Sequence, residues 1–220
     1  VQVLSLDLSW LSPLLIAFGV ILFTSSESSS RRNFARTAIG LGLMLLALKM
    51  VMLASAPLRQ TETMSVIMGP LSDEPMLAVL VAALITWAAH SSVATVLLVA
   101  TLASIHVLNM QLAFALVLGA NLGGAITAMV ATLGAPPPAR RVTLGNLMMR
   151  GVGVAIVLGA IAYLQPVIAI AGDHPARLVA NFHTAFNLAL AVLFLPLVGV
   201  VDKLARRIIP DVIEENDPGR

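Results

Sequence analysis

Long apolar runs separated by short polar stretches dominate the chain, and two of these runs carry polar or glycine-rich interruptions near their middle. The first, from Pro75 to Ile105, is interrupted by Ala89-His90-Ser91-Ser92-Val93-Ala94-Thr95. The next run, which ends at Gly134, is interrupted by Gly119-Ala120-Asn121-Leu122-Gly123-Gly124. Each half of the first run is shorter than the roughly 20 residues that a helix needs to cross a bilayer.

Two half-helices that meet inside the membrane would fit such interrupted runs. Unwound backbone at that depth is tolerated only where protein buries it or where it lines a cavity, so a pair of interruptions indicates a transport site. The alternative is a serine-rich kink and a glycine-rich packing face, both of which are common in membrane helices. On the first interpretation, the second run is a discontinuous helix.

The rest of the chain contains apolar spans and little charge. Spans are predicted over Leu8–Thr24, Thr37–Pro57, Leu147–Ala171 and Leu178–Val201. With 59% hydrophobic residues, 11% charged residues and a mean hydropathy of +0.96, the chain is far more apolar than a soluble domain. We therefore predict an all-α, multi-pass membrane protein, with a membrane domain over residues 1–205 and a cytoplasmic linker tail over 206–220.

Basic residues set the predicted topology. Most of the thirteen lysines and arginines fall in three clusters, which are Arg31/Arg32/Arg36, Arg140/Arg141/Arg150 and Lys203/Arg206/Arg207. Such clusters belong on the cytoplasmic side of a membrane, and a net charge of only +2 argues against a nucleic-acid surface. All three clusters lie inside only if the run from Pro75 to Ile105 enters and leaves on the same side. We predict a re-entrant helical hairpin, entered from outside, with its tip at His90-Ser91-Ser92.

The interrupted runs contain no lysine or arginine, so an anion would have to be bound by hydroxyls, amides and backbone N–H groups. The half-helix beginning near Ser91 presents free N–H groups at its positive end. Ser91, Ser92 and Thr95 add hydroxyls, and their oxygens also suit a small hard cation. Asn121 supplies both a donor and an acceptor, and Thr127 lies further along the second run.

Four segments together resemble the bacterial sodium/phosphate cotransporter family. They are His90-Ser91-Ser92-Val93-Ala94-Thr95, Gly119-Ala120-Asn121-Leu122-Gly123-Gly124, Ala139-Arg140-Arg141-Val142 and Phe182-His183-Thr184-Ala185-Phe186-Asn187. The first two correspond to that family's Gln-Ser-Ser-Ser-Ala-Thr and Gly-Ala-Asn-Ile-Gly-Thr motifs. The chain departs from them in His90 for glutamine, Val93 for serine and Gly124 for threonine.

The resemblance implies sodium-coupled transport of inorganic phosphate across the cytoplasmic (inner) membrane by alternating access, with sodium as the coupling ion and no other cofactor or catalytic activity. It implies phosphate contacts at Ser91, Ser92 and Asn121. Sodium contacts are expected at His90, Ser92, Thr95, Asn121 and Thr127. His90 could instead titrate and couple a proton. His183 and Asn187, four residues apart on one helix face, could line the site or form a packing hydrogen bond.

Each motif occurs once in the chain, which predicts half of an inverted-repeat transporter. An N-terminal repeat before Val1, inserted in the opposite orientation, would complete the site. A homodimer is the other source of a second copy, although two identical chains would insert in the same orientation. Two further functions stay open: an intramembrane enzyme with Ser91 or Ser92 as the nucleophile and a histidine as the base, and a membrane scaffold that has lost transport.

Overall fold

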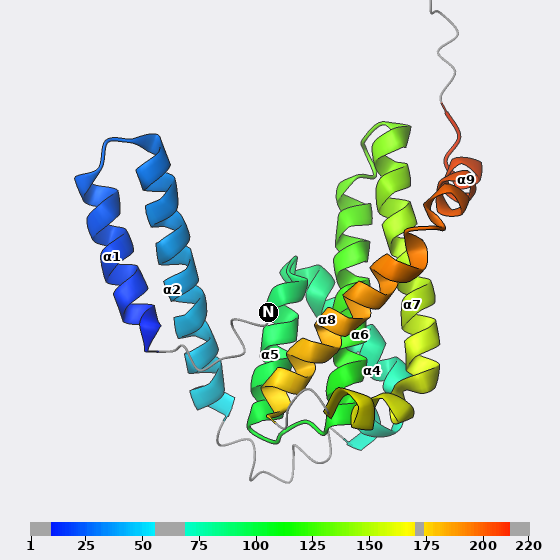
Figure 1. Ribbon diagram of the computed structural model, residues 1–220, viewed down its shortest axis with the longest axis horizontal. Coiled ribbons are helices and arrows are strands. Elements are labelled where there is room, and N and C mark those ends of the chain that lie inside the picture. The colour runs from blue at the N-terminus through cyan, green and yellow to red at the C-terminus, as the bar shows by residue number, and fades with distance from the viewer. Residues whose placement is uncertain (1–9, 56–68, 170–173, 212–220) are drawn as a thin grey trace, which may run out of the picture.

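The computed structural model describes residues 10–55, 69–169 and 174–211, and every regular element in these ranges is a helix (Figure 1). The helices are α1 (Leu11–Ser25), α2 (Ser29–Ser55), α4 (Pro75–Ala89), α5 (Ser92–Ser104), α6 (Met110–Ala131), α7 (Pro137–Ala169), α8 (Pro175–Phe194) and α9 (Val198–Ile208). The all-α prediction is confirmed. The hairpin of α1 and α2 stands beside a bundle that α4 to α8 form around α6.

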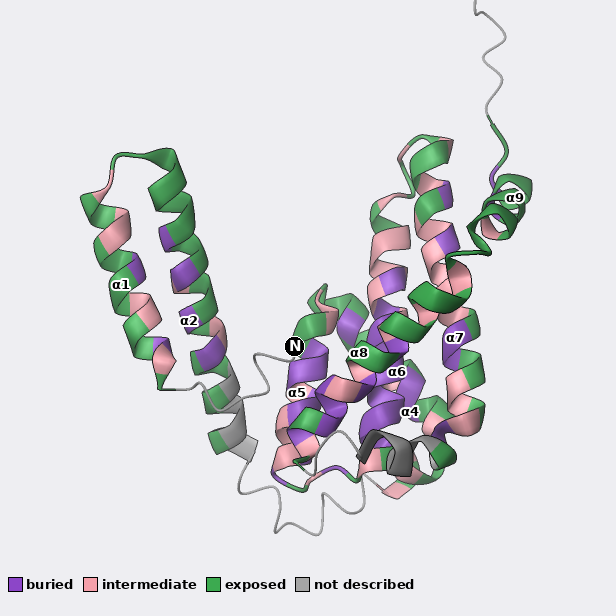
Figure 2. Ribbon diagram, in the orientation of Figure 1, coloured by how far each residue is buried: buried purple, intermediate pink, exposed green. Residues whose placement is uncertain are grey.

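Three helical stretches are long and apolar enough to cross a membrane: Met110–Ala131, Pro137–Ile161 and Pro175–Phe194. Buried residues concentrate on α6 and on the helices packed around it, whereas α1 and α2 are mostly exposed (Figure 2). The Phe114 ring on α6 stacks on the Phe182 ring of α8 with centroids 4.4 Å apart. The chain therefore folds as a membrane protein with α6 at its centre.

The first predicted interruption is present. Helix α4 ends at Ala89, His90 adopts the left-handed conformation (φ 54°, ψ 24°), and α5 begins at Ser92. The Ser91 hydroxyl caps α5 by accepting a hydrogen bond from the Ala94 N–H at 3.2 Å. At about 1.5 Å per residue, these helices of 15 and 13 residues are shorter than the hydrocarbon core of a bilayer. Whether the pair re-enters the membrane stays a prediction.

The second predicted interruption is wrong, because α6 runs without a break through Gly119-Ala120-Asn121-Leu122-Gly123-Gly124. The glycines serve close packing instead. A Cβ atom on Gly119 would overlap the carbonyl oxygen of Val79, and one on Gly123 would overlap that of Ala83. Helices α4 and α6 therefore approach backbone to backbone, as small residues allow in membrane helices.

Several predicted boundaries also move. The span expected from Thr37 begins at Ser29, and the span expected from Leu147 begins at Pro137 and already contains Arg140 and Arg141. Proline suits a first helical turn, where its missing N–H would have had no partner. The last span ends at Phe194 rather than Val201, and a turn at 195–197 leads into the separate helix α9.

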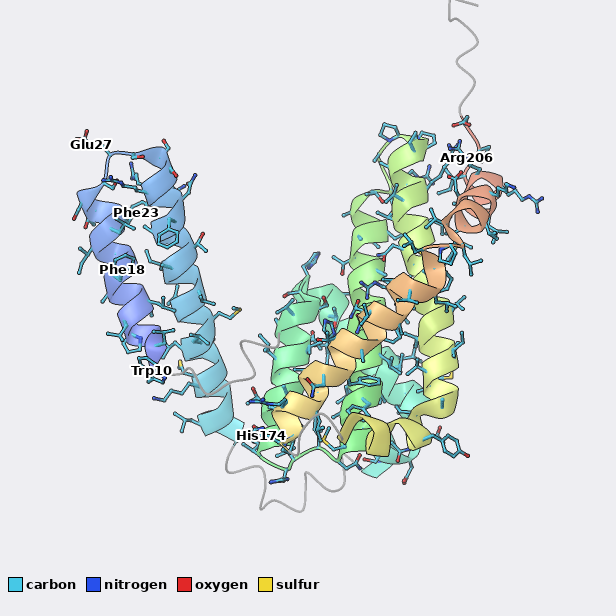
Figure 3. The ribbon with its side chains drawn as sticks, viewed as in Figure 1. Trp10, Phe18, Phe23, Glu27, His174 and Arg206 are labelled. Carbon is cyan, nitrogen blue, oxygen red and sulfur yellow. The ribbon has the colours of Figure 1, made fainter. Side chains whose placement is uncertain are left out.

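The arginine-rich ends gather on one side of the molecule. In the view of Figure 1, the loop between α1 and α2, the loop between α6 and α7, and α9 all lie at the upper end. Figure 3 marks that end with Glu27 and Arg206 and the opposite end with His174. This arrangement is the one expected if these ends are cytoplasmic.

Candidate functional site

The tip of the α4–α5 hairpin meets α6 close to Asn121. A Cβ atom on Gly124 would lie 3.3 Å from the Ser92 Cβ and 3.4 Å from its hydroxyl oxygen. Gly124 follows Asn121 by three residues, or about 4.5 Å along the helix axis. The structure therefore brings the serine motif of the hairpin against the part of α6 that carries the glycine motif. Because Gly124 has no side chain, Ser92 can approach α6 at this point.

A hydroxyl pair closes the hairpin just below its tip. The Thr86 hydroxyl on α4 donates to the Thr95 hydroxyl on α5 at 2.9 Å, and both side chains are buried. The Thr95 hydroxyl in turn donates to the Ser91 carbonyl oxygen at 3.3 Å. In this arrangement Thr86 and Thr95 hold the hairpin together, Ser91 caps α5, and Ser92 is the hydroxyl of the tip that faces α6.

His90 and Thr127 bond within their own segments. The exposed His90 ring places Nδ1 3.1 Å from the Ala88 carbonyl oxygen, and the Thr127 hydroxyl donates to the Gly123 carbonyl oxygen at 2.9 Å. In the described part of the chain, neither side chain hydrogen-bonds to Asn121. Of the predicted site residues, the structure therefore groups Ser91, Ser92 and Thr95 at the hairpin tip, whereas the side chains of His90 and Thr127 bond to the backbone of their own segments.

Asn121 is the centre of a polar cluster that joins three helices. Its side chain is 2% exposed, and its Oδ1 accepts hydrogen bonds from Arg150 Nη1 on α7 at 2.5 Å and from Asn187 Nδ2 on α8 at 3.1 Å. Its Nδ2 donates to the Val117 carbonyl oxygen at 2.9 Å and lies 3.3 Å from His183 Nδ1. His183 and Asn187 thus take part in this cluster, and Asn121 has a partner for each of its hydrogen-bonding positions.

Arg150 is the residue of this cluster that sequence reasoning missed. The charge pattern grouped it with Arg140 and Arg141 at a cytoplasmic end, but it lies on a membrane-length stretch of α7. The signal was available in the sequence, because Arg150 falls inside the predicted apolar span Leu147–Ala171. An intramembrane arginine is costly and points to function.

Only some of the N–H groups of the Arg150 guanidinium donate hydrogen bonds to described residues. Its Nε donates to the Asn146 Oδ1 at 3.2 Å and its Nη1 donates to Asn121. The other N–H groups of the five have no hydrogen-bond partner among the described residues, and no carboxylate in those residues forms an ion pair with Arg150. The cluster therefore presents a fixed positive charge with free donors.

A cavity of about 410 Å³ lies beside this charge. Its lining is apolar apart from Asn146, Arg150 and Asn187, and it consists of residues Asn146, Met149, Arg150, Asn187, Leu190, Ala191, Val192, Phe194, Leu195 and Val198. The lining extends from Arg150 to the turn between α8 and α9, which lies at the arginine-rich end. An anion in this cavity would meet one cation and two amides among apolar walls.

The family of the chain follows from comparison with known proteins. The model of the Na+/Pi-cotransporter family matches residues 1–53 and 54–197. The chain belongs to this family. No solved structure matches the chain.

Curated relatives are longer than this chain. YjbB of Escherichia coli (strain K12), named as a candidate inorganic phosphate export protein, is 38% identical over 210 residues, covering 96% of this chain and 39% of YjbB. The protein of the same name in Salmonella typhimurium is 37% identical over the same length. YqeW of Bacillus subtilis, an uncharacterized protein, is 24% identical over 89% of this chain and 64% of YqeW. The chain thus spans 39% of the length of the YjbB proteins.

Proposed function

We propose that this chain forms part of a membrane transporter for inorganic phosphate and that Arg150 binds the phosphate. The observation that carries the proposal is the guanidinium of Arg150, which lies on a membrane-length helix, lines a cavity and forms no ion pair among the described residues. A partly buried cation with no carboxylate partner in the described part of the chain favours an anionic ligand. Arginine presents a planar set of N–H donors that suits phosphate oxygens, and family membership supports phosphate as that anion.

The surrounding residues have separate roles in this proposal. Asn121 and Asn146 orient the guanidinium, since each accepts one of its N–H groups. Asn187 lies at the cavity wall, where both N–H groups of its Nδ2 donate to the Asn121 Oδ1 and to the His183 carbonyl oxygen, so its role is to position Asn121. Ser91, Ser92 and the N-terminus of α5 supply further donors from the hairpin tip, where the positive end of the helix dipole also attracts an anion. Because no residue of the hairpin tip lines the cavity beside Arg150, we place the phosphate at Arg150 and treat the tip hydroxyls as more distant donors.

Sodium coupling and alternating access belong to the same proposal. The hydroxyls of Ser92 and Thr95 are suitable oxygen ligands for sodium, with His90 and Thr127 as neighbours and Asn121 as the amide ligand that the family resemblance implies. The lining of the cavity extends to the turn at the arginine-rich end, which the positive-inside rule places in the cytoplasm. Loading from that side would suit outward movement of phosphate across the inner membrane, the direction named for the YjbB relatives.

Inverted repeats would complete this site. A second repeat of opposite orientation would bring another hairpin tip to the open side of the cavity, and a homodimer is the alternative assembly. The chain spans only 39% of YjbB, so the remaining length of such relatives has room for a repeat.

The enzyme and scaffold alternatives have less support. The Ser91 hydroxyl accepts the capping hydrogen bond from Ala94 N–H, a structural role that competes with nucleophilic attack. A scaffold without transport does not account for the positive charge that Arg150 retains beside a cavity. Membership of a transporter family also favours transport over catalysis.

Phosphate flux tests the proposal. The full-length protein would be reconstituted in proteoliposomes and the movement of radiolabelled inorganic phosphate followed, with Arg150→Gln as the test variant. Arg177→Gln is the matched control, because Arg177 is an exposed arginine on α8. At low sodium concentration we expect Arg150→Gln to lose most of the flux and Arg177→Gln to keep it. Equal flux from both variants would remove Arg150 from the site, and no phosphate flux from the unmodified protein would refute the function.

A further inference from the structure

The amide oxygen of Asn121 has no free position for a metal ion in this structure. An amide oxygen has two lone pairs, and those of Asn121 accept hydrogen bonds from Arg150 Nη1 at 2.5 Å and from Asn187 Nδ2 at 3.1 Å. A sodium ion could bind to this oxygen only by displacing one of these donors. The shorter of the two contacts is to a group that is itself a cation.

Arg150 is held where it is by more than this contact. Its Nε donates to Asn146 Oδ1, one turn earlier on the same helix, so the guanidinium is fixed at two of its nitrogens. A guanidinium keeps its proton under all physiological conditions. In this structure the oxygen of Asn121 is thus in contact with a permanent positive charge that is covalently attached to α7.

A coupling sodium ion and a fixed guanidinium have the same electrostatic effect on a bound phosphate, since each offsets part of its negative charge in a site of low dielectric constant. The sodium ion and the guanidinium differ in whether the positive charge crosses the membrane. Sodium crosses the membrane with the phosphate, whereas Arg150 stays with the protein. The occupant of the Asn121 oxygen therefore determines how many sodium ions accompany each phosphate.

We infer that Arg150 is a tethered substitute for a sodium ion at Asn121, so that phosphate moves with fewer sodium ions than it would if this position were open. This inference rests on the proposed phosphate transport. It removes Asn121 from the sodium ligands and leaves the hairpin hydroxyls as the remaining candidates. Any sodium bound there is additional to the charge that Arg150 supplies.

The sodium dependence of phosphate flux tests this inference. Full-length protein in proteoliposomes would be assayed for inorganic phosphate flux over a range of sodium concentrations, with choline as the replacement cation. The variants are Arg150→Ala, which opens the position, and Arg177→Ala as the control. We expect Arg150→Ala to be nearly inactive without sodium, and to recover with sodium or guanidinium ions and not with choline. Its flux should carry an additional sodium ion per phosphate, measured with sodium-22, while Arg177→Ala should match the unmodified protein.

A second pair of variants covers the case in which Arg150→Ala does not fold. Arg150→Lys keeps a tethered charge and should keep the sodium-to-phosphate ratio of the unmodified protein, whereas Arg150→Gln lacks the charge and should raise it. An unchanged ratio in both neutral variants, or loss of flux that neither sodium nor guanidinium restores in a folded variant, would overturn the inference. These outcomes differ from failure of the proposed function, in which the unmodified protein moves no phosphate.

Discussion

Asn121 on α6 and Arg150 on α7 are joined by a hydrogen bond of 2.5 Å from Arg150 Nη1 to the Asn121 amide oxygen, and the Asn121 side chain is 2% exposed. The neutral amide orients the guanidinium without cancelling its charge. A carboxylate at the same position would form an ion pair and leave less positive potential for an anion. The choice of asparagine over aspartate thus keeps Arg150 available.

Asn121→Asp should therefore weaken phosphate binding with little change in side-chain shape. A negative charge a few ångströms from the proposed phosphate costs several kcal/mol at a dielectric constant of about 20, so we expect at least about a tenfold loss of affinity. Equilibrium binding of radiolabelled phosphate to the purified full-length protein measures this. Asn109→Asp is the control, since Asn109 caps α6 at an exposed position and aspartate caps equally well. Equal affinities for the two variants would contradict the role given to Arg150.

Gly123→Ala should destabilise the packing of α4 on α6. Its Cβ would overlap the Ala83 carbonyl oxygen, and backbone cannot yield as a side chain does. Overpacking of this kind costs about 1–3 kcal/mol. Thermal unfolding in detergent would compare it with Gly151→Ala, where no neighbouring atom obstructs the new methyl group. We expect a lower midpoint for Gly123→Ala and an unchanged or higher midpoint for Gly151→Ala, and equal midpoints would argue against close contact of these helices.

Ser92→Ala should weaken phosphate or sodium binding much more than Ser104→Ala. Ser92 lies at the hairpin tip beside Gly124, whereas the Ser104 hydroxyl donates to the Thr101 carbonyl oxygen at the other end of α5. A lost hydrogen bond to a charged group is worth about 1.5–3 kcal/mol, or roughly ten- to a hundredfold in affinity. Isothermal titration of the two variants with phosphate and sodium would decide. Similar losses in both would make Ser92 a packing residue.

The sequence was sufficient to predict the interruption at His90 and Ser91, but it did not predict that α6 is continuous. Two halves too short to span, with a serine at their junction, leave few alternatives to a turn capped by that serine. A glycine motif alone is compatible both with a broken helix and with a continuous helix that packs closely against a neighbour. Whether Gly119 and Gly123 break a helix or admit a neighbour depends on the carbonyl oxygens of Val79 and Ala83, which are distant in sequence.

The polar cluster escaped prediction for a related reason. Its two hydrogen bonds to the Asn121 oxygen join residues 29 and 66 positions apart, so no local pattern contains them. Arg150 was visible as an arginine in an apolar span, but the count of positive charges near helix ends assigned it to the loop cluster. Since α7 begins at Pro137, Arg150 lies several turns inside the helix rather than at its start.

The membrane topology of the hairpin can be tested by cysteine labelling. Single cysteines at Asp73, His106 and Ala139, all exposed positions, would be treated with a membrane-impermeant reagent in intact cells. A re-entrant hairpin entered from outside predicts labelling from outside at Asp73 and His106 and only after permeabilisation at Ala139. Labelling of Asp73 and His106 from opposite sides would show that the run from Pro75 to Ile105 crosses the membrane.

Phosphate-dependent stabilisation is the most direct test of the claim that Arg150 binds phosphate. A ligand that binds only the folded state stabilises it by about 2.7 kcal/mol at a hundred times its dissociation constant. In buffer with choline in place of sodium, thermal unfolding of the full-length protein should therefore shift to higher temperature with inorganic phosphate, and this shift should vanish in Arg150→Gln and persist in Arg177→Gln. A phosphate shift of equal size in Arg150→Gln would contradict the account.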